Sequence, residues 1–269
     1  MFDRQLGEKA AVNLKRLRAK KPLIHNITNY VVMNVTANAL LACGASPVMA
    51  HAQGEVEEMV SFAGALVLNI GTLTPYWVDS MLIAGKRANE LNVPIILDPV
   101  GSGATKLRNE SAKRLMEELF ISVVRGNASE VLSLAHEGSR TKGVDAMHSV
   151  DEAAETATEL ARELHTTLAI TGPLDLVTDG ERTYRVSNGH ELMGYVTGTG
   201  CTASVIIGAF LAVDNDAAAA AATALAYFGL AGEKAAANAK APGGFQVALL
   251  DALFTIDEEQ LGQGARIQS

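Results

Sequence analysis

The sequence predicts an α/β protein in which a mostly parallel central sheet carries helices on both faces. Short apolar runs alternate with amphipathic segments of helical period along most of the chain, which is the pattern of repeated strand–helix–strand units. Runs such as ALVLNIG at 65–71 are continuously apolar, as parallel strands buried on both faces are. No linker, repeat or low-complexity tract interrupts the alternation, so we expect residues 1–269 to form a single domain.

The first 135 residues predict a helix followed by strands and helices in alternation. The N-terminal helix is amphipathic and lacks the apolar stretch of a signal peptide. Gly44 provides a stop for the second helix, Pro75 suits a first helical turn and Asn127 suits an N-cap. The expected strands are 22–27, 46–50, 65–71, 93–101 and 121–126, and the expected helices are 1–21, 29–44, 55–64, 75–92, 109–120 and 127–135.

The second half of the chain predicts one more helix, a group of three strands and three closing helices. Ser149 and Glu152 form the Ser-x-x-Glu pattern of a capping box for a helix at 149–165. The expected strands are 166–172, 175–180 and 182–188. The last two suit a hairpin over Asp179–Gly180. Segment 136–149 is the longest loop-like stretch, and both a surface connection and a functional loop are open for it.

The composition excludes several classes of protein. Hydrophobic residues make up 48% and charged residues 19% of the chain, which is enough for a large core. The net charge of −8 argues against nucleic-acid binding, although a small anionic ligand needs only a local pocket. Cys43 and Cys201 lie in apolar, helix-like contexts, which is typical of a reduced, cytoplasmic protein. The most apolar long segment, 216–237, is rich in alanine and predicts a buried helix rather than a membrane span.

A polar set of residues follows the apolar runs, where ligands bind in open α/β sheets. The set comprises Asn26, Thr28, Met49, His51, Asn69, Gly71, Thr72, Asp98, Pro99, Gly101, Arg125, Gly126, Asn127, Glu130, Thr171 and Gly172. Its composition suits a phosphorylated ligand with a divalent cation, and Asp98 and Glu130 are candidate Mg²⁺ ligands, directly or through water. Structural roles are also open, because Asp98 could be a helix cap or a loop carboxylate, Glu130 could interact favourably with the dipole of its helix, and Arg125 could form an ordinary salt bridge.

The segment VTGTGCTAS at 196–204 is more specific. Gly198 and Gly200 allow a sharp turn, after which the N–H groups of residues 199–201 and the start of a helix can form an anion hole. The same helix start predicts a lowered pKa for the Cys201 thiol. Cys201 could then be a base, a nucleophile or a small buried residue. GTGCTA also fits the loose dinucleotide pattern G-x-G-x-x-A, but its place near the C-terminus argues against that function.

The chain resembles the hydroxyethylthiazole kinase family of the ribokinase-like superfamily. The resemblance rests on segments that occur in the family's order between about residues 20 and 250, among them HNITNYVV, GASPVM, ALVLNIG, PIILDPVG, VVRGNASE and VTGTGCTAS. It implies a three-layer sandwich and ATP-dependent phosphorylation of the primary alcohol of 4-methyl-5-(2-hydroxyethyl)thiazole. It also implies Mg²⁺ and a homotrimer with active sites at the subunit interfaces.

The matching motifs suggest roles for individual residues. Met49 and Gly198 would contact the thiazole, and Asn26, Gly71 and Thr72 are further substrate-binding candidates. Arg125, Thr171 and Asn127 would bind ATP, and Asp98 and Glu130 would order Mg²⁺. Cys201 stands where most of the superfamily has aspartate, and Gly198 and Gly200 would form the catalytic anion hole beside it. His51 lies in a stretch that varies in the family, so no role carries over to it.

Chemistry limits what Cys201 can do. An alcohol is far less acidic than a thiol, whose ordinary pKa is about 8.5, so full deprotonation of the alcohol before attack is unfavourable. We therefore expect Cys201 to orient the hydroxyl and to accept its proton late. Three alternatives are open: a thiol hydrolase, for which no histidine stands in a recognisable Cys/His arrangement and His25 is only a candidate at the sheet edge; a non-catalytic binding protein; and a kinase for another small alcohol such as a hydroxymethylpyrimidine.

Overall fold

A computed structural model of the protein describes residues 2–135 and 150–269. It contains one nine-stranded sheet with the order β2-β1-β3-β4-β5-β6-β7-β8-β9. The strands are β1 Leu23–Ile27, β2 Ser46–Val48, β3 Ala65–Asn69, β4 Ile95–Asp98, β5 Val123–Gly126, β6 Thr167–Ile170, β7 Asp175–Thr178, β8 Thr183–Val186 and β9 Ile267–Gln268. Pairing is parallel from β2 to β6 and antiparallel from β6 to β9. The predicted α/β class with a mostly parallel sheet is confirmed.

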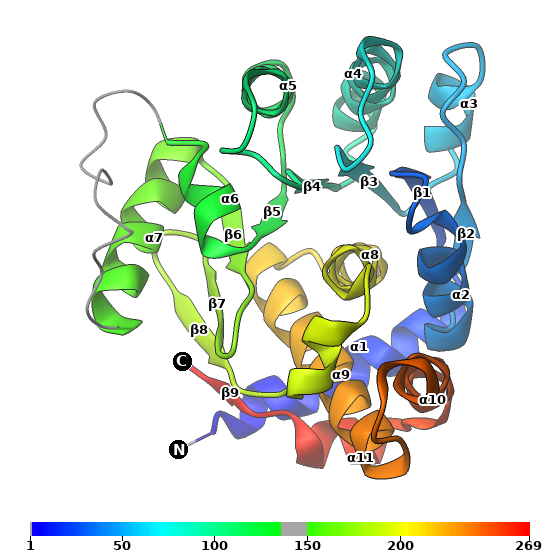
Figure 1. Ribbon diagram of the computed structural model, residues 1–269, viewed down its shortest axis with the longest axis vertical. Helices are drawn as coiled ribbons and strands as arrows, with labels where there is room; N and C mark the ends of the chain where they lie inside the picture. Colours follow the sequence, from blue (N-terminus) through cyan, green and yellow to red (C-terminus); the bar gives the residue numbers. More distant parts are fainter. Residues whose placement is uncertain (1, 136–149) are drawn as a thin grey trace.

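Helices cover both faces of the sheet, as Figure 1 shows. One layer contains α3 Val56–Val60, α4 Pro75–Glu90, α5 Lys106–Glu118, α6 Ala128–Leu132 and α7 Val150–Leu164. The other contains α1 Arg4–Lys20, α2 Met33–Cys43, α8 Thr199–Leu211, α9 Ala217–Asn238, α10 Pro242–Thr255 and α11 Glu258–Gly264, with a 3-10 helix, η2, at Glu191–Tyr195. Parallel neighbours require crossover connections, and the helices in these connections cover the faces of the sheet.

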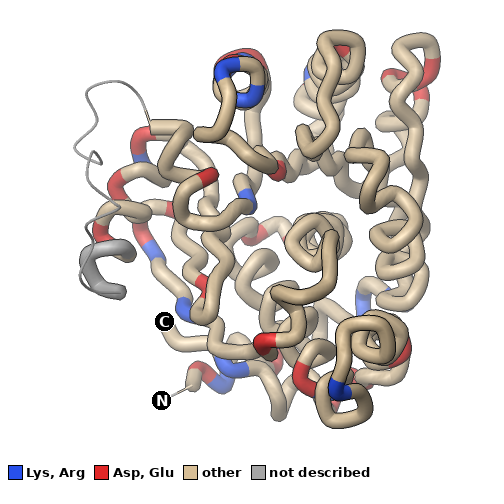
Figure 2. Tube along the Cα trace, viewed as in Figure 1, with Lys and Arg blue, Asp and Glu red and all other residues tan. Residues whose placement is uncertain are grey.

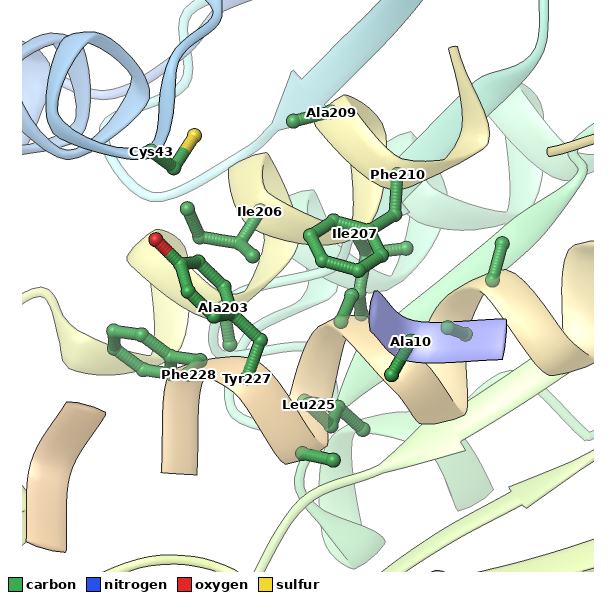
Figure 3. Packing of buried hydrophobic residues seen from close by; sticks show 14 of the residues in the cluster. Ala10, Cys43, Ala203, Ile206, Ile207, Ala209, Phe210, Leu225, Tyr227 and Phe228 are labelled. Carbon is green, nitrogen blue, oxygen red and sulfur yellow. The ribbon is translucent and has the colours of Figure 1, made fainter. Parts of the chain in front are cut away.

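Each central strand is buried on both faces because its side chains alternate between two hydrophobic clusters. Along β3, Ala65 and Val67 belong to the cluster with α8 and α9, whereas Leu66 and Leu68 belong to the cluster with α4 and α5. Figure 3 shows Phe210 of α8 beside Tyr227 of α9, with ring centroids 5.7 Å apart. Cys43 lies in the same cluster, and burial raises the pKa of its thiol to about 12, which makes it an unreactive core residue.

Several predicted boundaries shift for local reasons. The helix predicted at 109–120 begins at Lys106, because the Thr105 side chain accepts a hydrogen bond from the N–H of Arg108 and caps it. The helix predicted at 55–64 ends at Val60. The predicted stop at Gly44 is confirmed, since this residue has a φ of 105° and its N–H bonds to the carbonyls of the last turn.

The prediction of three closing helices is wrong: α8 to α11 are four, and the short strand β9 follows. The fourth helix begins at a capping box formed by Asp257 and Gln260. The hairpin over Asp179–Gly180 is confirmed by the antiparallel pairing of β7 with β8. Segment 136–149, and with it the expected Ser149 cap, lies outside the described residues.

The surface carries both signs of charge. In Figure 2 the basic residues are scattered over several elements and mixed with acidic ones, in agreement with the net charge of −8. Within the described ranges, no helix is long and apolar enough to cross a bilayer.

Candidate active site

The start of α8 lies at the carboxyl edge of the central strands. The helix packs against β1, β3 and β4, and ten of its residues, from Thr202 to Leu211, are buried. Gly198 is its N-cap with a φ of 85°, a left-handed conformation that favours glycine. The turn thus places Cys201 in the first helical turn, beside the ends of β3 and β4. The sharp glycine turn predicted from the sequence is confirmed.

Asn69, the last residue of β3, is the central residue of a polar network around Cys201. Its side-chain Nδ2 donates to Asp98 Oδ2 at 2.9 Å and to Cys201 Sγ at 3.1 Å. Its Oδ1 accepts from Asn29 Nδ2 at 2.8 Å and from the N–H of Gly71 at 2.9 Å. One amide therefore sets the relative positions of the thiol, a carboxylate and two loops.

Asn29 is a second donor to the sulfur, with its Nδ2 3.7 Å from Cys201 Sγ. It was not among the candidates, although it lies inside the HNITNY motif that carried the resemblance. The close packing of Asn29 also restricts which residue can stand at position 71, because a Cβ on Gly71 would lie 2.5 Å from Asn29 Nδ2. Only glycine fits there without displacing Asn29, so the predicted substrate-side residue Gly71 has a packing role in the site.

The expected lowering of the Cys201 pKa is wrong: the pKa of this thiol is raised to about 12. Burial is the largest cause, because it disfavours the charged thiolate, and the neighbouring Asp98 carboxylate adds to it. The hydrogen bond from Asn69, the Arg125 guanidinium and Asn29 act in the opposite direction with smaller effect. A helix N-terminus gives a thiol a lowered pKa only where burial and neighbouring carboxylates raise the pKa less than the helix lowers it. At Cys201 burial and Asp98 outweigh the lowering effects, so the residue is a neutral thiol near pH 7.

Asp98 ends β4 and is fully buried beneath the network. Its Oδ2 accepts from Asn69 and from Ser204 Oγ at 2.8 Å, and it lies 3.7 Å from Arg125 Nη1. Burial raises the pKa of this carboxyl, and Arg125 opposes the shift. Within the part of the chain that the structure describes, Asp98 Oδ1 is buried without a hydrogen-bond partner. A buried carboxylate with a free oxygen is uncommon and suits a ligand or cation.

The three predicted nucleotide-binding residues lie together on one cavity of about 570 Å³, lined by Arg125, Asn127, Thr171, Gly200, His190, Leu225 and other residues. Arg125 Nη2 donates to Thr171 Oγ1. A Cβ on Gly200 would lie 2.6 Å from Arg125 Nη1, so this glycine lets the guanidinium lie against the start of α8. The cavity combines apolar walls with a cation and a helix N-terminus, as sites for phosphorylated ligands do.

Asn127 and Glu130 form the capping box of α6, with each side chain bonded to the other's N–H. Glu130 Oε1 also accepts from the N–H of Gly101 at 2.8 Å. The expected first-turn role of Glu130 is therefore present, and its carboxylate additionally holds the loop after β4. Across residues 2–135 and 150–269, no three histidine, cysteine, aspartate or glutamate residues group closely enough to hold a metal by themselves.

The other substrate-side candidates lie along β1, β2 and the loop after β3. Asn26 is buried and donates from Nδ2 to the carbonyls of Ile24 and Val48. Thr72 Oγ1 accepts from the N–H of Tyr30 at 3.1 Å, and Met49 follows β2 half-buried. His25 bonds to the Ala50 carbonyl at 2.8 Å instead of to Cys201. In the described part of the chain, the side chains that donate hydrogen bonds to the Cys201 sulfur are those of Asn29 and Asn69 and not a histidine.

The fold is that of the ribokinase-like class of α/β proteins. A ribokinase-like superfamily protein from Enterococcus faecalis V583 shares the fold, with a TM-score of 0.67, 13% identity and 95% coverage of both chains. The hydroxyethylthiazole kinase family model matches residues 14–259. The chain belongs to the hydroxyethylthiazole kinase family.

Two individual relatives have high identity over nearly the whole chain. The hydroxyethylthiazole kinase of Desulfotalea psychrophila is 66% identical, covering 96% of this chain and 95% of the relative. The structure of a hydroxyethylthiazole kinase from Pyrococcus horikoshii OT3 superposes with a TM-score of 0.89 at 47% identity, covering 97% of this chain and 98% of the other. The Pyrococcus horikoshii protein therefore shares the fold over nearly the whole of this chain.

Proposed function

We propose that the protein transfers the terminal phosphoryl group of ATP to the primary alcohol of 4-methyl-5-(2-hydroxyethyl)thiazole. The observation that carries the proposal is the Asn69 network, which holds Cys201 and Asp98 beside the glycine turn of α8. The nucleotide cavity with Arg125 adjoins the same turn. An acceptor alcohol at Cys201 would then face a phosphoryl group at the start of the helix, which suits in-line transfer.

On the acceptor side, Cys201 orients the alcohol as a neutral thiol. Because burial and Asp98 hold its pKa at about 12, a resident thiolate base is scarce near pH 7. Phosphoryl transfer depends mostly on positioning and charge stabilisation, so the alcohol proton can leave late, after the new P–O bond has begun to form. We place Met49, Gly198, Asn26, Gly71 and Thr72 around the thiazole, on the strength of the matching motifs and their location at this edge.

On the nucleotide side, Arg125, Thr171 and Asn127 bind ATP, and the N–H groups at the start of α8 stabilise the transferring charge with Gly198 and Gly200. The residues present fit Mg²⁺, because Asp98 Oδ1 is free and magnesium needs only one or two carboxylates besides phosphate oxygens. Glu130 would act through water, since both of its oxygens already accept N–H groups. When bound, Mg²⁺ would neutralise charge on the phosphates.

A coupled ADP-release assay tests this function. We expect turnover with ATP, Mg²⁺ and 4-methyl-5-(2-hydroxyethyl)thiazole, and none when a hydroxymethylpyrimidine replaces the thiazole. The distinction matters because the two alcohols require differently shaped pockets. Turnover with the pyrimidine alone would show that the hydroxymethylpyrimidine, and not the thiazole, is the substrate. ATP binding with no turnover of either alcohol would contradict the proposed kinase activity.

We also propose that residues 1–269 act as one cytoplasmic domain that assembles into a homotrimer with the sites at the interfaces. The continuous sheet supports a single domain. Exposed apolar residues on and beside two neighbouring helices support assembly. Leu41 lies on α2 and Val31 just before it, and Val247 and Phe254 lie on α10, which packs against α2. Sedimentation equilibrium should give three times the chain mass of 28.2 kDa. A concentration-independent monomer mass would contradict the assembly.

A further inference from the structure

The guanidinium of Arg108 on α5 bonds to three backbone carbonyls at the edge of the site. Nη1 donates to the carbonyl of Ile70 at 3.0 Å, and Nη2 donates to that of Gly71 at 2.6 Å. Nη1 also donates to the carbonyl of Val100. Ile70 and Gly71 belong to the loop after β3, and Val100 belongs to the loop after β4. One side chain therefore joins the two loops.

These contacts differ from those of an ordinary surface arginine. Arg108 is half-buried, and the hydrogen bonds of its guanidinium go to backbone carbonyls instead of to a carboxylate. Arginine suits such a position because its planar fork directs several N–H groups along fixed lines, which the single ammonium of lysine cannot reproduce. A Cβ on Gly101 would lie 3.1 Å from Arg108 Cδ, so the neighbouring glycine leaves room for the fork.

The two loops belong to different halves of the proposed reaction. The loop after β3 carries Gly71, whose N–H bonds to Asn69 and which faces Asn29 beside the acceptor side. The loop after β4 follows Asp98, and its Gly101 N–H bonds to Glu130 on the phosphate and metal side. We propose that Arg108 is a positioning residue. It holds the loop after β3, on the acceptor side, and the loop after β4, on the phosphate side, at the relative position that phosphoryl transfer requires. This inference rests on the proposed function for its kinetic part only.

The location of Arg108 predicts which kinetic constant changes. The nucleotide cavity is lined mainly by residues of β5, the loop after β6, the segment before α8, the start of α8 and α9, and Arg108 is not among them. Loss of the fork should therefore leave the KM for ATP close to that of the wild type. A small misalignment between acceptor and phosphate lowers the rate steeply, so kcat should fall roughly 10- to 100-fold in Arg108→Ala.

The test compares Arg108→Ala, Arg108→Lys and Arg114→Ala with the wild type. Arg114 lies on the same helix but is exposed and pairs with Glu118 and Asp79, so it controls for effects on α5 alone. We expect both Arg108 variants to lose kcat, because lysine keeps the charge without the fork. In both Arg108 variants, backbone hydrogen–deuterium exchange should be faster than in the wild type in segments 70–73 and 99–104. In Arg114→Ala, exchange in these two segments should be the same as in the wild type.

Two results would overturn the inference. One is exchange in those segments no faster than in Arg114→Ala, and the other is a wild-type kcat in either Arg108 variant. If the wild type itself fails to phosphorylate the thiazole, the proposed function fails. The exchange measurement still decides the role of Arg108, because it requires no substrate.

Discussion

Asn69→Asp is expected to remove most turnover and to make the fold sensitive to rising pH. The substitution keeps the shape of the side chain but replaces the Nδ2 donor, 2.9 Å from Asp98 Oδ2, with a carboxylate oxygen. Two carboxylates at this distance cannot both ionise, so they share a proton and the pKa of the pair is raised. The donor to Cys201 Sγ is lost as well. We expect kcat to fall about 100-fold, as when a site loses one fixed donor.

The direction of the pH effect follows from linkage. A carboxyl whose pKa is higher in the folded than in the unfolded state stabilises the fold only while it is protonated. Relative to the wild type, the free energy of unfolding should therefore be highest at low pH and should fall as pH rises above the ordinary aspartate pKa of about 4. The slope is about 1.4 kcal/mol per pH unit for one such proton. Urea unfolding across this range measures it.

Asn38→Asp is the matched control for this experiment. Asn38 is exposed on α2 and donates only to Asn34 Oδ1, so the substitution adds the same charge without a neighbouring carboxylate. Its stability should follow the wild type at every pH. A difference between Asn69→Asp and the wild type that stays constant with pH would show that the two carboxyls do not compete, and that the network does not require an amide at this position.

Cys201→Ala is expected to slow turnover by roughly 10- to 100-fold without abolishing it, because the loss of an orienting group leaves the anion hole and the nucleotide site intact. The wild-type pH profile gives the more direct evidence. A thiolate with a pKa of about 12 would become tenfold more abundant with each pH unit from about 7 to 9. A neutral orienting thiol predicts instead that the wild type and Cys201→Ala have parallel, nearly flat kcat profiles.

Two further variants complete this series. Cys43→Ala removes the other thiol, which is buried in the core away from the site, and should leave kcat unchanged. Cys201→Asp should remain active with kcat rising with pH, because nearby Asp98 raises the pKa of a carboxyl placed there. A tenfold rise of wild-type kcat per pH unit would instead support a mechanism in which the Cys201 thiolate acts as the base. Background turnover in folded Cys201→Ala would contradict a purely orienting role.

Much of the fold could be predicted from local patterns. Continuous apolar runs marked the parallel strands, because strands buried on both faces have no polar side to alternate with. The stop at Gly44 and the cap at Asn127 were predictable because they depend on one residue's own conformation or side chain. One of the four closing helices was missed, and the capping box that starts α11 lies within a short stretch without glycine or proline. The antiparallel pair of β8 with β9 was missed because it joins segments about 80 residues apart.

The sequence by itself determined the fold class, the glycine turn before α8 and the set of residues at the carboxyl edge, because these depend on periodicity, glycine conformation and the order of the elements. Only the tertiary structure decided how that set is connected. The sulfur lies against Asn69 and Asn29, Glu130 holds Gly101, and Arg108 spans two loops. The Cys201 pKa shows the reason most clearly. A helix start is visible in the sequence, but burial and a carboxylate 103 residues away are not, and together they outweigh it.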